Sequence, residues 1–226
     1  MTINLSISII KESVKYSELI AAIIGTIYFY KYKHTPLKYL LYLLWYITCT
    51  EFFSLYANEN EVLIYIGKSG QKYNLWMFNL LEIITFLTFF YIYFKSIKNL
   101  SYKLWIKIFM ISYIIISIIN WSILQNFILE WSELPYIIGS FFIIGTILFY
   151  FVELLRSEKI LLFHRTLLFW VSVGLLLFFA GTLPFTIKMN GYALIPKIHK
   201  LFLIMYILAI AMYLIFTFGF IWSKKE

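Results

Sequence analysis

The chain is 226 residues long, with 62% hydrophobic and 13% charged residues, and its mean hydropathy is +0.85. A soluble domain has roughly half apolar and about a quarter charged residues, and one of this size would leave too much apolar surface facing water. This composition excludes a soluble globular enzyme, a disordered tail and a nucleic-acid binder with a basic face. We therefore expect an all-α polytopic membrane protein, with residues 1–226 forming a single transmembrane helical domain.

Several chemistries lack the residues that they need. All 11 acidic residues are glutamate, which excludes Ser-His-Asp triads and aspartyl dyads. A lone cysteine, Cys49, cannot form an internal disulfide or a thiol-exchange pair. The three histidines, His34, His164 and His199, are too scattered for a local metal motif. Because the chain also lacks the H-E-x-x-H and G-x-S-x-G patterns, we expect no enzymatic activity, no cofactor and no metal.

Seven stretches are long and apolar enough to cross a bilayer, which takes about 20 residues of helix. The predicted spans are residues 14–32, 39–57, 75–94, 104–123, 135–155, 162–187 and 201–222. The fourth is the weakest, because Lys107 and Asn120 shorten its apolar centre. The sequence thus predicts a seven-helix bundle in the lipid bilayer.

The distribution of Lys and Arg predicts the orientation of this bundle. Twelve of the 19 basic residues lie at one set of span ends, which should face the cytoplasm. These are Lys31, Lys33, Lys38, Lys95, Lys98, Lys103, Lys107, Arg156, Lys159, Arg165, Lys224 and Lys225. We therefore expect the N-terminus outside and the C-terminus inside a bacterial inner membrane. The formal charge of +8 is attributed to these ends and not to nucleic-acid binding.

Two acidic residues within the spans are the strongest candidates for a site, because a charge near the middle of a span costs about 2.5–3.5 kcal/mol. Glu51 lies about 13 residues after Lys38, or roughly 20 Å from the inner surface. Glu82 lies about seven residues into the third span, or roughly 10 Å below the outer surface. In a core about 30 Å thick, both carboxylates are therefore predicted at nearly the same depth, in the outer half.

Polar neighbours accompany both acids. Thr48 precedes Glu51 by one helical turn, and Asn79 precedes Glu82 in the same way. Lys188 and Lys200 border the outer ends of the last two spans, so these six residues could frame a cleft that binds a cation, an amine or a proton. The alternative is that each glutamate bonds across helices to Asn79, a tyrosine or a lysine and only holds the bundle together.

Glu18 and Glu153 are expected near the ends of their helices, at the membrane interface. The sixth span carries two further features. Gly174 and Gly181 are seven residues apart and share one helix face, which permits close approach of a neighbouring helix. Pro184 lacks a backbone donor and is expected to kink or end the helix near Ala180. This region is either a moving element or ordinary bundle packing.

Three segments carry a resemblance to other proteins: LWMFNLLEII at residues 75–84, LFWVSVG at residues 168–174 and HKL at residues 199–201. They resemble a group of bacterial seven-helix integral membrane proteins of similar length, whose activity is uncharacterised. The resemblance implies the same helix count over most of the chain. It supplies no catalytic residue and no ligand.

Three functions are compatible with the sequence. In the first, the protein is a receptor-like sensor in which an external small ligand or proton engages Glu51 and Glu82, and movement around Pro184 is read by a cytoplasmic partner. In the second, it is a small secondary transporter or channel in which the same acids carry a coupling ion. In the third, it is an accessory subunit that anchors a soluble effector. The ligand and the oligomeric state are left open.

Overall fold

The computed structural model describes residues 2–66, 72–187 and 199–225, and these form an all-α protein. The long helices are α1 (Thr2–Ile27), α2 (Lys38–Asn60), α3 (Leu75–Ser96), α4 (Leu100–Ile119), α5 (Glu133–Leu155), α6 (Leu167–Ile187) and α8 (His199–Trp222). Short helical segments are η1 (Phe29–Lys31), η2 (Asn120–Leu124) and η3 (Glu158–Arg165), and β1 (Tyr65–Ile66) pairs antiparallel with β2 (Lys72–Tyr73). The predicted all-α fold is confirmed.

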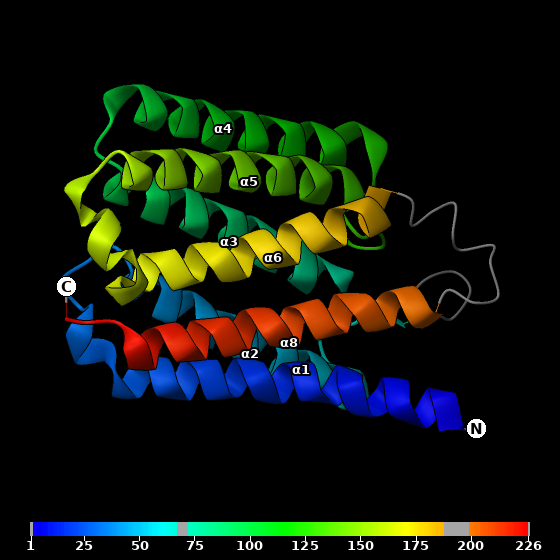
Figure 1. The fold of residues 1–226 in the computed structure, drawn as a ribbon. Helices are drawn as coiled ribbons and strands as arrows, with labels where there is room; N and C mark the ends of the chain where they lie inside the picture. Colours follow the sequence, from blue (N-terminus) through cyan, green and yellow to red (C-terminus); the bar gives the residue numbers. More distant parts are fainter. Residues whose placement is uncertain (1, 67–71, 188–198, 226) are drawn as a thin grey trace.

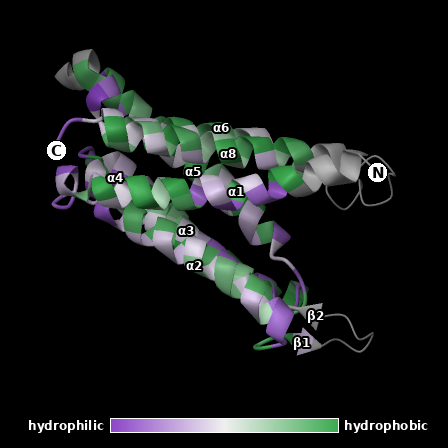
Figure 2. Cartoon of the chain, turned by 90° about the horizontal axis from the view of Figure 1, so that it is seen from below, coloured by the Kyte–Doolittle hydropathy of each residue, from purple (hydrophilic) through white to green (hydrophobic). Residues whose placement is uncertain are grey.

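Six of these helices, α2, α3, α4 with η2, α5, α6 and α8, are long and apolar enough to cross a membrane. In Figure 2 they are mostly green, the colour of hydrophobic residues, whereas purple gathers at the connections. The helix ends carry specific signals. Asn99 caps α4 by accepting hydrogen bonds from the backbone of Ser101 at 2.9 Å and of Tyr102 at 3.3 Å, and Glu61 ends α2 in the left-handed conformation with φ of 57°.

Helix α1 differs from its predicted span, and it is absent from the six apolar helices named above. It begins at Thr2 and ends at Ile27, whereas the sequence predicted residues 14–32. Four charged residues, Lys11, Glu12, Lys15 and Glu18, interrupt its apolar stretch. Lys15 and Glu18 are nevertheless buried, at 8% and 2% exposure. Part of the charged face of α1 is therefore buried against the other helices, which allows the helix to pack along the bundle.

The sixth span also begins later than predicted. Residues from Glu158 to Arg165 form the 3-10 segment η3, and Thr166 is extended, with φ of −98° and ψ of 135°. Helix α6 therefore starts at Leu167 and not at residue 162. At its other end the helix does not stop near Ala180 but continues through Pro184 to Ile187; the predicted kink stays a prediction.

Six helices enclose the interior of the protein. Along the closed path α1, α2, α3, α5, α6, α8 and back to α1, each helix contacts the next, and we call this arrangement the helix ring. Helix α4 packs outside it, against α3 and α5 (Figure 1). Large side chains with at most 1% exposure pack between the helices, including Phe86, Phe90, Tyr93 and Phe216.

The α6–α8 contact is especially close, as the shared glycine face predicted. A Cβ atom added at Gly174 would lie 2.8 Å from the ring of Phe216, and one at Gly181 would lie 2.6 Å from Leu208. From the other side, a Cβ at Gly219 would lie 2.8 Å from Trp170. Glycine therefore lets the two helix backbones approach along most of their length.

Contacts between distant segments hold the predicted cytoplasmic end together. The Lys31 ammonium group donates to the carbonyl oxygens of Phe220, Ile221 and Ser223 at 3.2, 2.7 and 2.8 Å. Because those carbonyl groups lie at the end of α8, the ammonium group of Lys31 caps the C-terminus of that helix. The Lys224 amide donates to the Arg165 carbonyl oxygen at 2.9 Å, which joins η3 to the same end.

Candidate functional site

A cavity of about 270 Å³ lies inside the helix ring, and all six ring helices contribute to its wall. Its volume is just below the range of about 300–1,000 Å³ typical of ligand pockets, so it suits a small molecule. The wall is mainly apolar and aromatic. Three acidic side chains line it: Glu18 from α1, Glu51 from α2 and Glu82 from α3. The structure therefore brings Glu51 and Glu82 to one cavity and adds a third acid.

Glu82 lies at one side of the cavity, within a cluster of aromatic rings. Its Oε2 accepts a hydrogen bond from Trp131 Nε1 at 3.2 Å. The centroid of the Trp131 ring lies 5.3 Å from that of Tyr136, which in turn lies 6.0 Å from Phe86. Glu82 Oε1 is buried and has no hydrogen-bond partner in the described part of the chain. We call this group, with Phe179, the Glu82 pole.

Asn79 has a different place from the one predicted. It is completely buried but does not line the cavity. Its Nδ2 donates to the carbonyl oxygens of Phe127 at 2.7 Å and Glu130 at 2.8 Å, and its Oδ1 accepts from the Ser132 amide at 3.1 Å. Asn79 is therefore a positioning residue, because it holds the loop that carries Trp131 against Glu82.

Glu18 and Glu51 lie at the other side of the cavity. Glu18 is only 2% exposed, and its carboxyl group interacts with the hydroxyl groups of Thr48 and Tyr213. Its Oε1 is buried without a partner among residues 2–66, 72–187 and 199–225. The charge of half-buried Glu51 acts on Glu18. We call Glu18, Glu51, Thr48 and Tyr213 the Glu18 pole.

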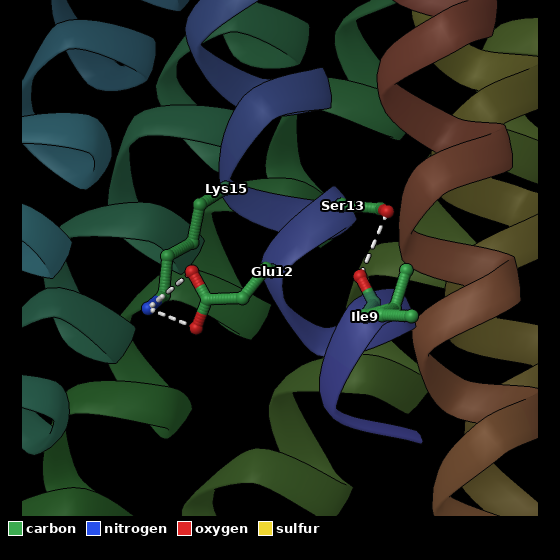
Figure 3. A network of polar contacts seen from close by, with 4 residues as sticks. All are labelled: Ile9, Glu12, Ser13 and Lys15. Carbon is green, nitrogen blue, oxygen red and sulfur yellow. Dashed lines mark hydrogen bonds and ion pairs between the residues drawn. The ribbon is translucent and has the colours of Figure 1, made fainter. Parts of the chain in front are cut away.

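The buried basic side chain near the Glu18 pole, Lys15, is paired with another acid. Lys15 Nζ forms an ion pair with Glu12, at 3.1 and 3.3 Å from its two oxygens (Figure 3). In the same view, Ser13 Oγ bonds to the Ile9 carbonyl oxygen at 2.9 Å. The charges of Lys15 and Lys11 also act on Glu51. Within the described residues, however, none of the three cavity acids forms an ion pair.

The structure does not describe the side chains of two predicted site residues. Lys188 lies outside the described residues, and Lys200 belongs to the first turn of α8 without a described side chain. The predicted cleft between these lysines therefore stays a prediction. Among the described residues, no group of three or more His, Cys, Asp or Glu side chains could hold a metal ion.

Glu18, Trp131 and Tyr213 are cavity residues that the sequence analysis missed. Glu18 was placed at the interface because the first span was predicted to begin at residue 14, whereas the helix begins at Thr2. A signal was nevertheless present, since charges at positions 11, 12, 15 and 18 recur at the spacing of one helix face. Glu153, the other acid expected at an interface, accepts from the backbone amides of Lys98 and Asn99 at 2.8 and 2.9 Å.

Comparisons of the chain with protein-family models, with curated proteins and with solved structures found no match. The seven-helix group suggested by three short segments is thus not identified in this way. The structure supports the coarser statement that this is an all-helical, multi-pass membrane protein with long apolar helices.

Proposed function

We propose that the protein is a receptor-like membrane sensor whose ligand is a small organic cation bound inside the helix ring. The observation that carries this proposal is the cavity wall, where three acidic side chains are interspersed among aromatic rings. Carboxylates attract a positive charge, and aromatic faces favour cations within about 6 Å of their centroids. Buried carboxylate oxygens without partners are costly, and an ammonium donor would satisfy them.

The position of Trp131 supports entry from the predicted outer side. Trp131 belongs to the loop between η2 and α5, at the end of the bundle opposite to η1 and the end of α8. The residue both bonds to Glu82 and lines the cavity. A ligand that reaches Glu82 would therefore displace or reposition a loop that faces the outside in the predicted orientation.

The interior favours a sensor over a transporter or channel. Transporter sites often lie where membrane helices are discontinuous, whereas each ring helix runs unbroken over its described length. On the side of the cavity towards the predicted cytoplasmic end, Tyr93 of α3 and Ser172 of α6 are fully buried and bonded at 2.7 Å. In this proposal the ligand signal reaches a cytoplasmic partner through helix movement, without passage of the ligand.

Binding is tested with the full chain in lipid nanodiscs and phenethylamine, a monocation with one ring, as the probe. We expect saturable binding and a change in Trp131 fluorescence, because the amine competes for the carboxylate that Trp131 donates to. Glu82→Gln should weaken binding by about tenfold or more, since a charge-assisted hydrogen bond is lost. Glu59→Gln, at an exposed position near the end of α2, is the matched control and should bind normally.

Two further measurements separate the alternatives. A Trp131→Phe variant should lose the fluorescence change. This loss would assign the signal to Trp131 among the seven tryptophans of the chain. Proteoliposomes with labelled phenethylamine outside should show binding without accumulation. Uptake that disappears in Glu51→Gln would instead establish the transporter. A fluorescence response to pH that is unaffected by any amine would establish a proton sensor.

A further inference from the structure

The three cavity acids are divided between two separate places. Glu82 is on α3, with the aromatic side chains of α5 and of the preceding loop around it. Glu18 and Glu51 are on α1 and α2, with Tyr213 of α8 beside them. Glu51 acts on Glu18, whereas the hydrogen-bond donor to Glu82 is Trp131, on the loop before α5.

Each pole has an unfilled acceptor. Glu18 Oε1 and Glu82 Oε1 are both buried and lack a hydrogen-bond partner within the described ranges. Lys15 is the single buried basic side chain of the described residues, and its ion pair is with Glu12. Within the part of the chain that the structure describes, Glu18 and Glu82 therefore share one cavity and neither has a bonded cation.

The rest of the cavity wall is mainly apolar. Leu44 and Ile47 of α2, Phe78 and Leu81 of α3, and Leu175 of α6 line the same cavity. An apolar chain would bury its methylene groups against these side chains, at about 0.8 kcal/mol for each buried CH₂. A polar or hydrated linker would lose its water without gaining partners.

We infer that the ligand is an organic dication: two ammonium groups, one at the Glu82 pole and one at the Glu18 pole, joined by an apolar chain. This inference rests on the proposed function and adds the number and separation of the charges. One unpartnered carboxyl oxygen lies at each pole, Glu18 Oε1 and Glu82 Oε1 among the described residues, so a ligand with two ammonium groups would supply a donor to both. Thr48 and Tyr213 add hydroxyl oxygens that can accept from a primary ammonium group.

The test compares α,ω-diaminoalkanes from 1,4-diaminobutane to 1,10-diaminodecane with the monoamines of equal length, by titration calorimetry of the full chain in nanodiscs. We expect one intermediate chain length to bind most tightly, about tenfold or more above its monoamine, because the second ammonium group binds as a tethered partner. Shorter diamines should not span the poles, and longer ones should not fit.

Variants locate the two ends of the ligand. In Glu18→Gln and in Glu82→Gln alike, the best diamine should fall to the affinity of its monoamine, while Glu59→Gln keeps the difference. The wild-type amine series does not depend on whether these variants fold. If diamines bind no more tightly than monoamines, the dication inference is overturned and the proposed function stands. If no amine binds at all, the proposed function itself fails.

Discussion

Asn79 shows how a single buried amide can serve a site that it does not touch. All three of its strong hydrogen bonds go to the backbone of residues 127–132, and Trp131 lies within that stretch. The loop has little regular structure of its own, so Asn79 is a main support for its position, together with Trp121, which donates to Ser132 Oγ at 2.6 Å. The sequence analysis proposed Asn79 as a site residue from its place one turn before Glu82, but could not predict that its side chain bonds to the backbone of a loop.

Asn79→Ala is expected to destabilise the protein, because two carbonyl groups and one amide lose their partner in a buried place. The cost should be on the order of 1–3 kcal/mol, measured as a lower thermal unfolding temperature in detergent micelles. The amine-dependent change in Trp131 fluorescence should shrink as well. Asn60→Ala is the control, since Asn60 is exposed and bonds only within α2. Equal stability of the two variants would contradict the positioning role.

Lys31 offers a second prediction at the scale of one residue. Burial lowers the pKa of its ammonium group, yet the group is retained there by three carbonyl oxygens at the end of α8. Lys31→Met keeps most of the apolar stem and removes the donors, so the last turn of α8 should fray. Amide hydrogen exchange should become faster for residues 219–223. Lys33→Met, which removes an exposed charge nearby, should leave the exchange of these residues unchanged.

At the scale of elements, the glycine contacts between α6 and α8 make a sharp prediction. In Gly174→Ala the new Cβ would lie 2.8 Å from the Phe216 ring and 3.3 Å from the Met212 carbonyl oxygen, so both must shift. We expect destabilisation of about 1–3 kcal/mol from overpacking. Gly145→Ala has its nearest contact at an ordinary 3.4 Å and should be neutral or stabilising by up to about 1 kcal/mol. A thermal unfolding series that ranks the two variants in the opposite order would refute this packing argument.

The helices themselves were largely predictable, because the bilayer demands long apolar segments and the chain provides them. The predicted segments 75–94 and 135–155 differ by only two residues at one end from α3 and α5. The exceptions are where hydropathy alone was insufficient. Helix α1 carries too many charged residues to be recognised by its hydropathy. Residues 162–166 mix apolar and polar side chains, and they form the end of the 3-10 segment η3 and an extended residue instead of the start of α6.

At the scale of the whole molecule, sequence could not predict which helix faces enclose the cavity. Glu51 and Glu82 were selected from their depth along the chain, and both line it. Glu18 joins them only because α1 closes the helix ring between α2 and α8. Ring closure depends on contacts between helices that are far apart in the sequence, and a single sequence contains no direct record of such contacts.

The orientation of the molecule is open to a direct test. In a Cys49→Ser background, Lys33→Cys places one thiol at an exposed position before the start of α2, and Glu59→Cys places one at an exposed position near its end. The excess of basic residues at the Lys33 end predicts that this end is cytoplasmic. A membrane-impermeant maleimide should therefore label Glu59→Cys in intact cells, and Lys33→Cys only after permeabilisation. The reverse pattern would mean that the bundle is inserted the other way round.

The inward-facing charges of α1 have a consequence for biogenesis. With four charged residues in its central part, this helix is a poor substrate for the translocon, since a single central Lys costs about 2.5–3.5 kcal/mol. The partners that bury Glu18 come from α2 and from α8, and α8 leaves the ribosome after every other described helix. Of the described helices, the first in chain order thus gains the full burial of Glu18 only when the last has docked against it. In nascent chains halted before α8, helix α1 lacks the α8 side chain that helps to bury Glu18. We therefore expect membrane quality-control proteases to degrade such chains.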